Sequence, residues 1–207
     1  MVIRLLTTLQ QSYNNHAAVR DQSEIEPWKL NEREQFLIRI RQAGFRTLLE
    51  IGAGTGRDSL YFQKNGLKVT AVDFAEEMVR LCKAKGLADV RLMDFTRLDF
   101  EPESFDAVYA MNCLLHIPKS QIEAVLGQIL NVLKPNGLFF YGVYGGWDWE
   151  GVWEDDHYEP KRFFSFFEDA AIQELVKRHF ELLDFHTVDQ GAKSPHFQSI
   201  SLRKPPA

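Results

Sequence analysis

Three glycines at alternate positions are the residues best suited to chemistry, because they directly follow a short apolar run. They are Gly52, Gly54 and Gly56, after residues 46–51, and Glu50 lies just before them. Alternate glycines let the backbone turn sharply and let a ligand lie against bare main chain. The helix expected next offers free N–H groups and the positive end of its dipole. The pattern predicts a site for a nucleotide-like or carboxylate-bearing ligand at the carboxyl end of a first strand.

Two acidic residues at the ends of later strand-like runs extend this site. Asp73 ends the second run, where a carboxylate can accept both hydroxyls of a ribose. Asp94 follows the third run, where it can accept the exocyclic amine of an adenine. The glycine spacing is G-x-G-x-G, which differs from the G-x-G-x-x-G of dinucleotide-binding proteins. This difference argues against an NAD-dependent oxidoreductase, which remains a less favoured alternative.

An aromatic and acidic stretch at residues 144–158 lies in an expected substrate-side loop over residues 145–167. It holds three of the four tryptophans, and we interpret it as a lid over a cationic or aromatic small substrate. An aromatic plug over the sheet end, or a protein-contact surface, is the alternative. Its acids are interpreted as a solvated turn, and no metal site is predicted. The candidate substrate-binding residues are Trp147, Trp149, Trp153 and His157.

The elements that must position these residues alternate between strand-like and helical runs. This alternation predicts a parallel sheet with helices on both faces. A helix near 168–178 then precedes two strand-like runs, 180–188 and 196–202, which should pair antiparallel at the sheet edge. The parallel strands are expected at 46–51, 68–72, 90–93, 105–111 and 138–144, and the helices at 32–42, 57–65, 75–85 and 119–133.

Five segments of the sequence resemble the class I S-adenosylmethionine (SAM) dependent methyltransferases of the small-molecule type. The resemblance implies an α/β, Rossmann-like fold whose seven-stranded sheet has the order 3-2-1-4-5-7-6, with strand 7 antiparallel. It implies a methyltransferase domain at residues 31–207, and an N-terminal helical lid at residues 1–30. The segments are 48–57 (LLEIGAGTGR), 69–78 (VTAVDFAEEM), 93–95 (MDF), 105–118 (FDAVYAMNCLLHIP) and 132–139 (VLKPNGLF).

The resemblance also implies roles for single residues in binding SAM and its product, S-adenosylhomocysteine. The three glycines would lie under the methionine part, Asp73 would hold the ribose, and Asp94 would bond the adenine N6. Phe74 and Met93 would flank the adenine, and Asn112 would line the sulfonium. The expected cofactor contacts are Tyr13, Trp28, Glu50, Gly52, Ala53, Gly54, Gly56, Asp73, Phe74, Met78, Met93, Asp94, Phe95 and Asn112.

Few catalytic residues are expected, because the methyl group of SAM is already activated and mainly requires alignment and a dry pocket. The candidates are His116, Asn112 and Tyr144, and a purely structural role for His116 stays open. Other structural alternatives also stay open: Phe74 and Met93 as core residues, and the N-terminal segment as a helix packed on the sheet edge.

Composition narrows the class of protein further. The chain has 207 residues, enough for one domain, and 24 basic against 29 acidic residues give a net charge of −5. The acidic balance argues against nucleic acid as a partner, and no apolar run is long enough for a membrane span. The sequence predicts a cytoplasmic monomer or homodimer that methylates a small molecule. The alternative from another class is a non-catalytic, SAM-binding regulatory module.

Overall fold

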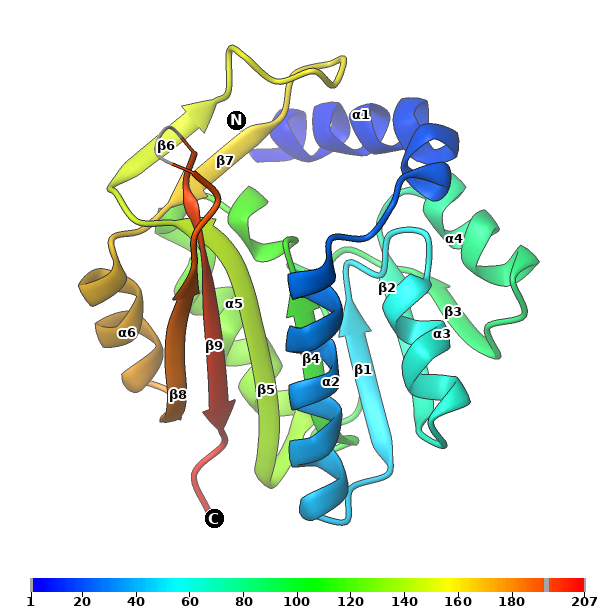
Figure 1. Cartoon of the computed structure of the whole chain (residues 1–207), viewed down its shortest axis with the longest axis vertical. Coiled ribbons are helices and arrows are strands. Elements are labelled where there is room, and N and C mark those ends of the chain that lie inside the picture. The colour runs from blue at the N-terminus through cyan, green and yellow to red at the C-terminus, as the bar shows by residue number, and fades with distance from the viewer. Residues whose placement is uncertain (1, 192–193, 207) are drawn as a thin grey trace.

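The computed structural model describes residues 2–191 and 194–206, and its centre is a mixed sheet of seven strands (Figure 1). The strand order is β3-β2-β1-β4-β5-β9-β8. Only β9 runs antiparallel to its neighbours, β5 and β8. This order confirms the predicted 3-2-1-4-5-7-6 sheet with its antiparallel seventh strand. The strands are β1 (Thr47–Ile51), β2 (Lys68–Asp73), β3 (Asp89–Leu92), β4 (Phe105–Met111), β5 (Leu133–Gly145), β8 (Glu181–Val188) and β9 (His196–Arg203).

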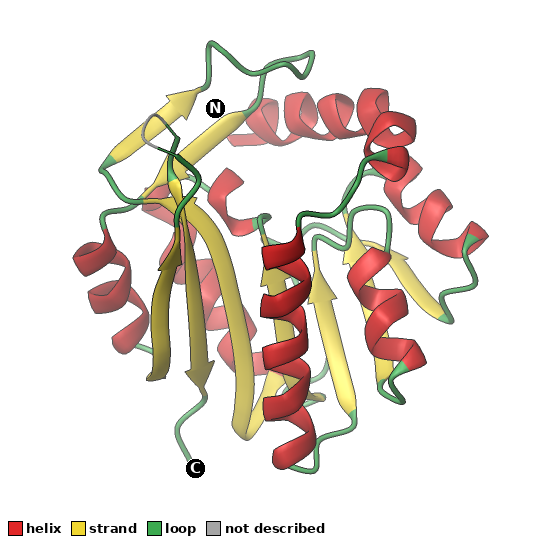
Figure 2. Cartoon of the chain, viewed as in Figure 1, coloured by secondary structure: helices red, strands yellow, loops and turns green. Residues whose placement is uncertain are grey.

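Helices cover both faces of the sheet, and the alternation of side chains along each strand explains why both faces are apolar (Figure 2). On β1, Leu48 belongs to the apolar cluster on the face covered by α2 and α3, whereas Leu49 belongs to the cluster on the face covered by α5. Both leucines are fully buried, so the strand appears in the sequence as a continuous apolar run. The helices are α1 (Val2–Gln22), α2 (Pro27–Gln42), α3 (Arg57–Lys64), α4 (Glu76–Ala84), α5 (Lys119–Val132) and α6 (Asp169–Lys177), with a short 3₁₀ turn at Leu114–His116.

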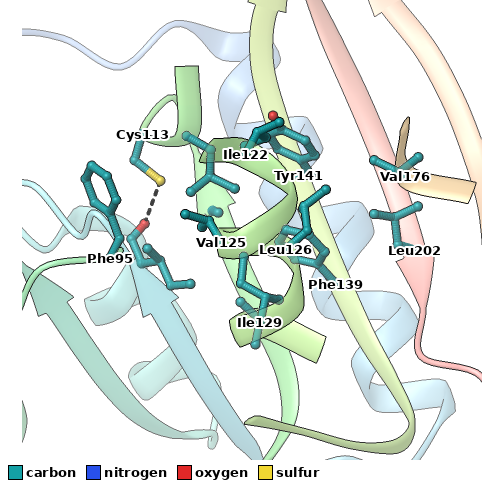
Figure 3. Close-up of a cluster of buried hydrophobic side chains, with 14 of the residues drawn as sticks. Phe95, Cys113, Ile122, Val125, Leu126, Ile129, Phe139, Tyr141, Val176 and Leu202 are labelled. Atoms are coloured by element: carbon teal, nitrogen blue, oxygen red, sulfur yellow. Dashed lines mark hydrogen bonds between the residues drawn. The ribbon is translucent and has the colours of Figure 1, made fainter. Parts of the chain in front are cut away.

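The larger part of the core lies between the sheet and α5 (Figure 3). Ile122, Val125, Leu126 and Ile129 form the apolar stripe of α5 that the sequence pattern predicts, and all four are buried. Burial of one such side chain is worth about 1.5–3 kcal/mol. Cys113 joins this core and its thiol donates to the Ile51 carbonyl oxygen at 3.1 Å, which ties the end of β4 to the end of β1. Cys113 is therefore a buried packing residue.

Three boundaries differ from the sequence expectation. The helix expected at 32–42 begins at Pro27, a residue favoured in the first turn of a helix, so the boundary expected at residue 30 falls inside α2. The strand expected at 138–144 begins at Leu133, and the turn at residues 135–137 is an irregularity in its pairing with β4. The expected loop over residues 145–167 contains a two-stranded antiparallel sheet of β6 (Trp149–Val152) and β7 (Phe163–Phe166).

The remaining N-terminal segment is α1, which crosses the carboxyl edge of the sheet beside the β6–β7 sheet (Figure 1). Its side chains bind α4 and the loop after β2: Gln10 donates to the Phe74 carbonyl oxygen at 2.7 Å, and Asn14 accepts the Glu77 N–H at 3.0 Å. None of the helices in the described ranges is long and apolar enough to cross a membrane. The edge of the sheet that should bind ligand is therefore covered by α1 on one side and by β6–β7 on the other.

Candidate active site

The glycine loop between β1 and α3 leaves free space beside its main chain at one position. Gly52, Gly54 and Gly56 all have positive φ, at 69°, 55° and 79°. A Cβ at Gly52 would overlap the Cys113 side chain, and one at Gly56 would lie 2.7 Å from Leu87 Cδ1. A Cβ at Gly54 would meet only Arg20 Nε, at 3.7 Å. Gly52 and Gly56 are thus required for close packing, and Gly54 is the position that leaves space for a ligand.

Two hollows lie along this edge, one at each end of the site expected for the cofactor. The first has a volume of about 140 Å³ and is lined by the glycine loop, Glu50, Asn112 and several residues of the α1–α2 corner. The second has a volume of about 370 Å³ and is lined by Phe74, Met93 and Asp94 below and by α1 residues above. The structure therefore brings the residues expected for the methionine end and for the adenine end to separate hollows under one helix.

Asp73 is buried at the end of β2 and lines neither hollow, but its carboxylate contacts the glycine loop and it directly precedes Phe74, which lines the second hollow. Its Oδ2 accepts the N–H of Gly54 at 2.8 Å, and its Oδ1 accepts the N–H of Ala75 at 2.9 Å. Burial raises the pKa of this carboxyl to about 6, although both amide hydrogen bonds and the charge of Arg20 act in the opposite direction. Each carboxylate oxygen retains acceptor capacity beyond its amide bond. The carboxylate therefore keeps the acceptor capacity for two adjacent hydroxyls that the sequence resemblance implies.

Glu50 makes the wall of the first hollow acidic. Its carboxyl is buried and accepts a short hydrogen bond from Ser59 Oγ. Burial and the nearby charge of Asp58 raise the pKa of Glu50 well above its usual range. Asp58 itself is paired with Arg33 at 2.8 Å. A cationic group in this hollow would relieve the cost of burying these acids.

Asn112 supplies the clearest sign of a missing partner. It adopts a left-handed backbone conformation with φ of 54°, and its N–H donates to the Gly142 carbonyl oxygen at 2.8 Å. Its Oδ1 is buried and has no hydrogen-bond partner among the described residues. A buried acceptor without a hydrogen-bond partner destabilises a protein by about 1–3 kcal/mol unless a donor pairs with it. Together with the opening at Gly54, this oxygen fits the ammonium group at the amino-acid end of SAM.

The adenine-side residues divide into two groups. Phe74, Met93 and Asp94 line the second hollow, and Asp94 accepts the N–H of Thr96 at 2.8 Å. Met78 and Phe95 are fully buried and line neither of the two hollows. Met78 packs with Ala17 of α1, and Phe95 lies in the main core beneath Phe74. Ala53 lines the first hollow with the glycines. The cofactor roles of these residues stay predictions.

The two N-terminal aromatics lie in different places. Tyr13 is close to the adenine side, since its ring is edge-on to Phe74 with centroids 6.3 Å apart. Trp28 instead packs on Phe197 and edge-on against Tyr144, with centroid separations of 4.5 Å and 6.4 Å. Trp28 lines neither of the two hollows, so the structure places it towards the expected acceptor side.

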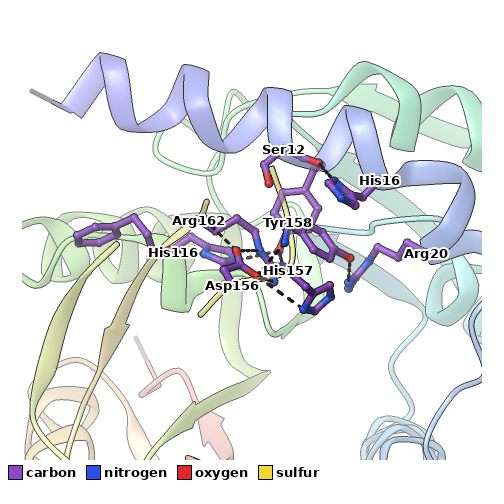
Figure 4. Close-up of polar contacts among 10 residues, drawn as sticks. Ser12, His16, Arg20, His116, Asp156, His157, Tyr158 and Arg162 are labelled. Atoms are coloured by element: carbon purple, nitrogen blue, oxygen red, sulfur yellow. Dashed lines mark hydrogen bonds and ion pairs between the residues drawn. The ribbon is translucent and has the colours of Figure 1, made fainter. Parts of the chain in front are cut away.

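His116 holds α1 to the core (Figure 4). Its Nδ1 lies 2.7 Å from the Phe163 carbonyl oxygen, and its Nε2 lies 2.7 Å from Tyr13 Oη. A carbonyl can only accept, so Nδ1 carries the proton and Nε2 accepts from the tyrosine hydroxyl. Burial, reinforced by the charge of Arg162, lowers the pKa of His116 to about 3. With both nitrogens engaged, this neutral imidazole has the geometry of a structural link.

Arg162 continues this link into the β6–β7 segment. It makes paired contacts to Asp156 at 2.8 Å and donates to Tyr13 Oη at 3.3 Å. Its guanidinium carbon lies 3.6 Å from the centroid of the Tyr158 ring, which stacks on His16 of α1 at 4.2 Å. Sequence reasoning named Tyr13 but missed Arg162 and the link between them, because no local motif relates α1 to residues more than a hundred positions away.

A third hollow is bordered by Tyr144 of β5. It has a volume of about 270 Å³, and its lining includes Tyr144, Trp153, His157, Phe164 and Phe166. Burial raises the pKa of Tyr144 to about 12, so its hydroxyl stays protonated at neutral pH.

The other two tryptophans expected at the substrate lie outside this lining. Trp149 packs against Trp153 and Phe166, with centroids 5.2 Å and 5.6 Å away. Trp147 is 37% exposed and touches the edge of Phe166. Only Trp153 and His157, of the four residues proposed for substrate, border the hollow. Among the described residues, no group of His, Cys, Asp or Glu side chains could hold a metal ion.

Comparison with known proteins identifies the class. Residues 48–137 match the family described as a methyltransferase domain. The sterol 24-C-methyltransferase ERG6B of Gibberella zeae is 33% identical over 56% of this chain and 31% of its own. The ubiquinone biosynthesis O-methyltransferase of Idiomarina loihiensis is 30% identical over 47% of this chain and 42% of its own. The chain thus spans less than half the length of these curated relatives.

A solved structure agrees over almost the whole fold. It is the 1,6-didemethyltoxoflavin-N1-methyltransferase of Burkholderia thailandensis with bound 1,6-didemethyltoxoflavin and S-adenosylhomocysteine. It is 23% identical, with a TM-score of 0.74, and the match covers 96% of this chain and 88% of that one. Residues 48–137 thus match a methyltransferase domain, and the sheet around them has the order that the sequence resemblance implies for class I SAM-dependent methyltransferases. SAM is the cofactor of that domain, and the residues around the glycine loop fit it.

Proposed function

We propose that the protein transfers the methyl group of SAM to a small-molecule acceptor that binds in the aromatic hollow beside Tyr144. One observation carries the proposal: the first hollow is bordered by Asn112 at the end of β4, and the aromatic hollow by Tyr144 near the end of the neighbouring strand β5. Asn112 lines the first hollow and donates its N–H to Gly142 of β5. Tyr144 lies two residues further along β5 and begins the aromatic hollow. A donor and an acceptor held this way would meet across the ends of β4 and β5.

The residues of this site would align the two reactants and exclude water from them, and none of them is an obvious general base. SAM, when bound, supplies a methyl group on a sulfonium, which needs a nucleophile aligned behind it. Asn112, Glu50 and Asp73 hold the cofactor side, and Tyr144 and Trp153 enclose the acceptor. His116 is engaged at both nitrogens and does not reach the reaction as a base in this conformation. The proposed chemistry therefore favours an acceptor whose nucleophilic atom needs little activation.

A small acceptor is supported by the size and charge of the proposed site. A hollow of about 270 Å³ is near the lower end of the range for small-molecule sites. The exposed acids Asp155 and Glu154 lie on its turn, and such a field repels phosphate backbones. The relatives and the solved neighbour are named for sterol, ubiquinone-pathway and toxoflavin-type acceptors. We propose a cytoplasmic enzyme, monomeric or homodimeric, that needs neither membrane nor nucleic acid.

The test is formation of S-adenosylhomocysteine in the presence of a panel of thiols, amines, phenols and nitrogen heterocycles. The proposal expects turnover with at least one small acceptor and none with transfer RNA or DNA. Binding of SAM without turnover across the panel would favour the non-catalytic module instead. Binding of NADH in preference to SAM would overturn the assignment of the cofactor.

A further inference from the structure

Arg20, in the last turn of α1, extends over the glycine loop. Its Nε lies 3.7 Å from the position that a Cβ at Gly54 would occupy, and the residue lines the first hollow. Its guanidinium carbon lies 5.6 Å from the centroid of the Tyr13 ring. Its Nη1 makes one long hydrogen bond, of 3.5 Å, to the hydroxyl of Tyr158. Figure 4 shows this side chain reaching from α1 towards Tyr158.

The other cations that line this hollow are already engaged. Lys29 forms an ion pair with Glu26. Arg57 donates to the carbonyl oxygens of Arg20 and Asp21, at 2.8 Å and 2.7 Å. Within residues 2–191 and 194–206, no carboxylate lies within 4.0 Å of Arg20. Arg20 is thus a largely enclosed cation, facing the hollow without an anionic partner.

A guanidinium has five donors in a planar arrangement that matches a carboxylate at two points. The lining of the same hollow also includes the acidic Glu50 and the unpartnered Oδ1 of Asn112. Glu50 and Asn112 suit an ammonium group, and Arg20 suits an anion. The hollow therefore suits an α-amino acid zwitterion, with its carboxylate towards α1.

We propose that Arg20 binds the α-carboxylate of the cofactor's methionine part and makes the site selective for cofactors that carry it. The proposal rests on the proposed function only in taking SAM as the ligand of this hollow. A carboxylate at Arg20 also fastens α1 over the bound cofactor, because Arg20 belongs to that helix. Through Tyr158, the same contact extends to the segment between β6 and β7.

The test compares S-adenosylhomocysteine with its decarboxylated analogue, which keeps the adenosine, the thioether and the ammonium. Calorimetry should show that the wild-type protein prefers the parent ligand by about tenfold or more, or roughly 1.4 kcal/mol. Arg20→Met keeps the length of the side chain and removes its charge. This variant should lose that preference, and the dissociation constant of the decarboxylated analogue should change by less than about twofold. Lys29→Met is the matched control and should keep the preference.

The outcomes separate this proposal from the proposed function. Unchanged binding of the analogue shows that the adenosine site of Arg20→Met is folded. If Arg20→Met keeps the full preference, or if Lys29→Met abolishes it, the assignment of Arg20 is wrong while the cofactor stands. If the wild-type protein binds neither ligand, the proposed function fails as well.

Discussion

Replacing Asp73 by Asn should weaken cofactor binding by a calculable amount. We expect this carboxylate to accept the two ribose hydroxyls of the cofactor, and a hydrogen bond to a charged group is worth about 1.5–3 kcal/mol. The loss of one such hydrogen bond corresponds to a rise of about 10- to 100-fold in the dissociation constant of S-adenosylhomocysteine. Asp89→Asn is the matched control, because Asp89 is also held by hydrogen bonds, to Thr70 and Arg91, but lies at the start of β3, away from the carboxyl edge of the sheet.

The pH dependence of binding makes this prediction sharper. Burial raises the pKa of Asp73 to about 6, and only its ionised form accepts both hydroxyls. At pH 5, Asp73 would be ionised in about one tenth of the ligand-free molecules. The dissociation constant of S-adenosylhomocysteine should therefore be about tenfold higher at pH 5 than at pH 7.5. Glu50 and Asp58 face the same loop and also have raised pKa values, so Asp73→Asn must be titrated in parallel. A wild-type affinity that is flat over this range, or an equal slope in Asp73→Asn, would refute the reasoning.

The stability of the ligand-free protein should change with pH in the opposite sense. Because the pKa of Asp73 is higher in the folded state than its ordinary 3.8, the folded protein binds more protons between about pH 4 and 6. The contribution of Asp73 to the free energy of unfolding therefore falls as the pH rises through this window. Denaturant titrations of the wild type and of Asp73→Asn should differ in this slope, and an identical slope would contradict the assigned pKa.

Three further predictions concern the glycine loop, α1 and the acceptor hollow. Gly54→Val should abolish binding of S-adenosylhomocysteine while leaving the far-ultraviolet circular dichroism unchanged, since only the ligand space and a positive φ are affected; normal calorimetric binding would show that the loop does not touch the ligand. Deleting residues 1–22 should raise the same dissociation constant at least about tenfold, or 1.4 kcal/mol, because α1 covers both cofactor hollows; an unchanged constant in a folded truncation would remove the proposed role of α1 as a lid. Trp153→Ala should lower the turnover of acceptor with little change in SAM affinity, whereas Trp147→Ala, on the exposed side, should change neither; equal losses of turnover in both variants would argue against the hollow as the acceptor site.

The parallel part of the fold was predictable because its signals are local. Each strand contains a short apolar run, and glycines mark where β1 ends, whereas residues 135–137 proved to lie inside β5. The hairpin of β8 and β9 followed from two strand-like runs with no helix between them, which only antiparallel pairing joins so directly. The start of α2 was missed because its first turn contains Pro27, Trp28 and Lys29, whose pattern shows no apolar stripe. The stripe becomes visible only from Phe36 onward.

The β6–β7 sheet was interpreted as a loop for a physical reason. Its strands are four residues each, they are separated by ten residues without a hairpin turn, and Gly151 interrupts the first. Aromatic contacts stabilise the pair instead, above all those of Trp149 and Trp153 with Phe166. Such cross-strand contacts depend on tertiary position and leave little periodic signal in the sequence.

The glycine loop and Asp73 could be located from the sequence, but the division of labour within the loop could not. Whether a glycine faces a ligand or a neighbouring side chain depends on Cys113 and Leu87, which come from other elements. Arg20 gave no signal either, because an arginine near the end of a helix is ordinary and its missing partner is a three-dimensional fact. A residue whose proposed role rests on an unpaired side chain can be recognised only once its neighbours in the structure are known.

The way α1 meets the β6–β7 segment determines how the two proposed sites relate. Tyr13 binds His116 from the end of β4 and Arg162 from the edge of the acceptor hollow. Arg20 covers the glycine loop and reaches Tyr158 from the same helix. A displacement of α1 large enough to expose the glycine loop must break these contacts, and so it must alter a wall of the acceptor hollow as well. Under the proposed function, α1 would therefore both cover the cofactor and help to enclose the acceptor, and Tyr13 fastens it to His116 at the end of β4.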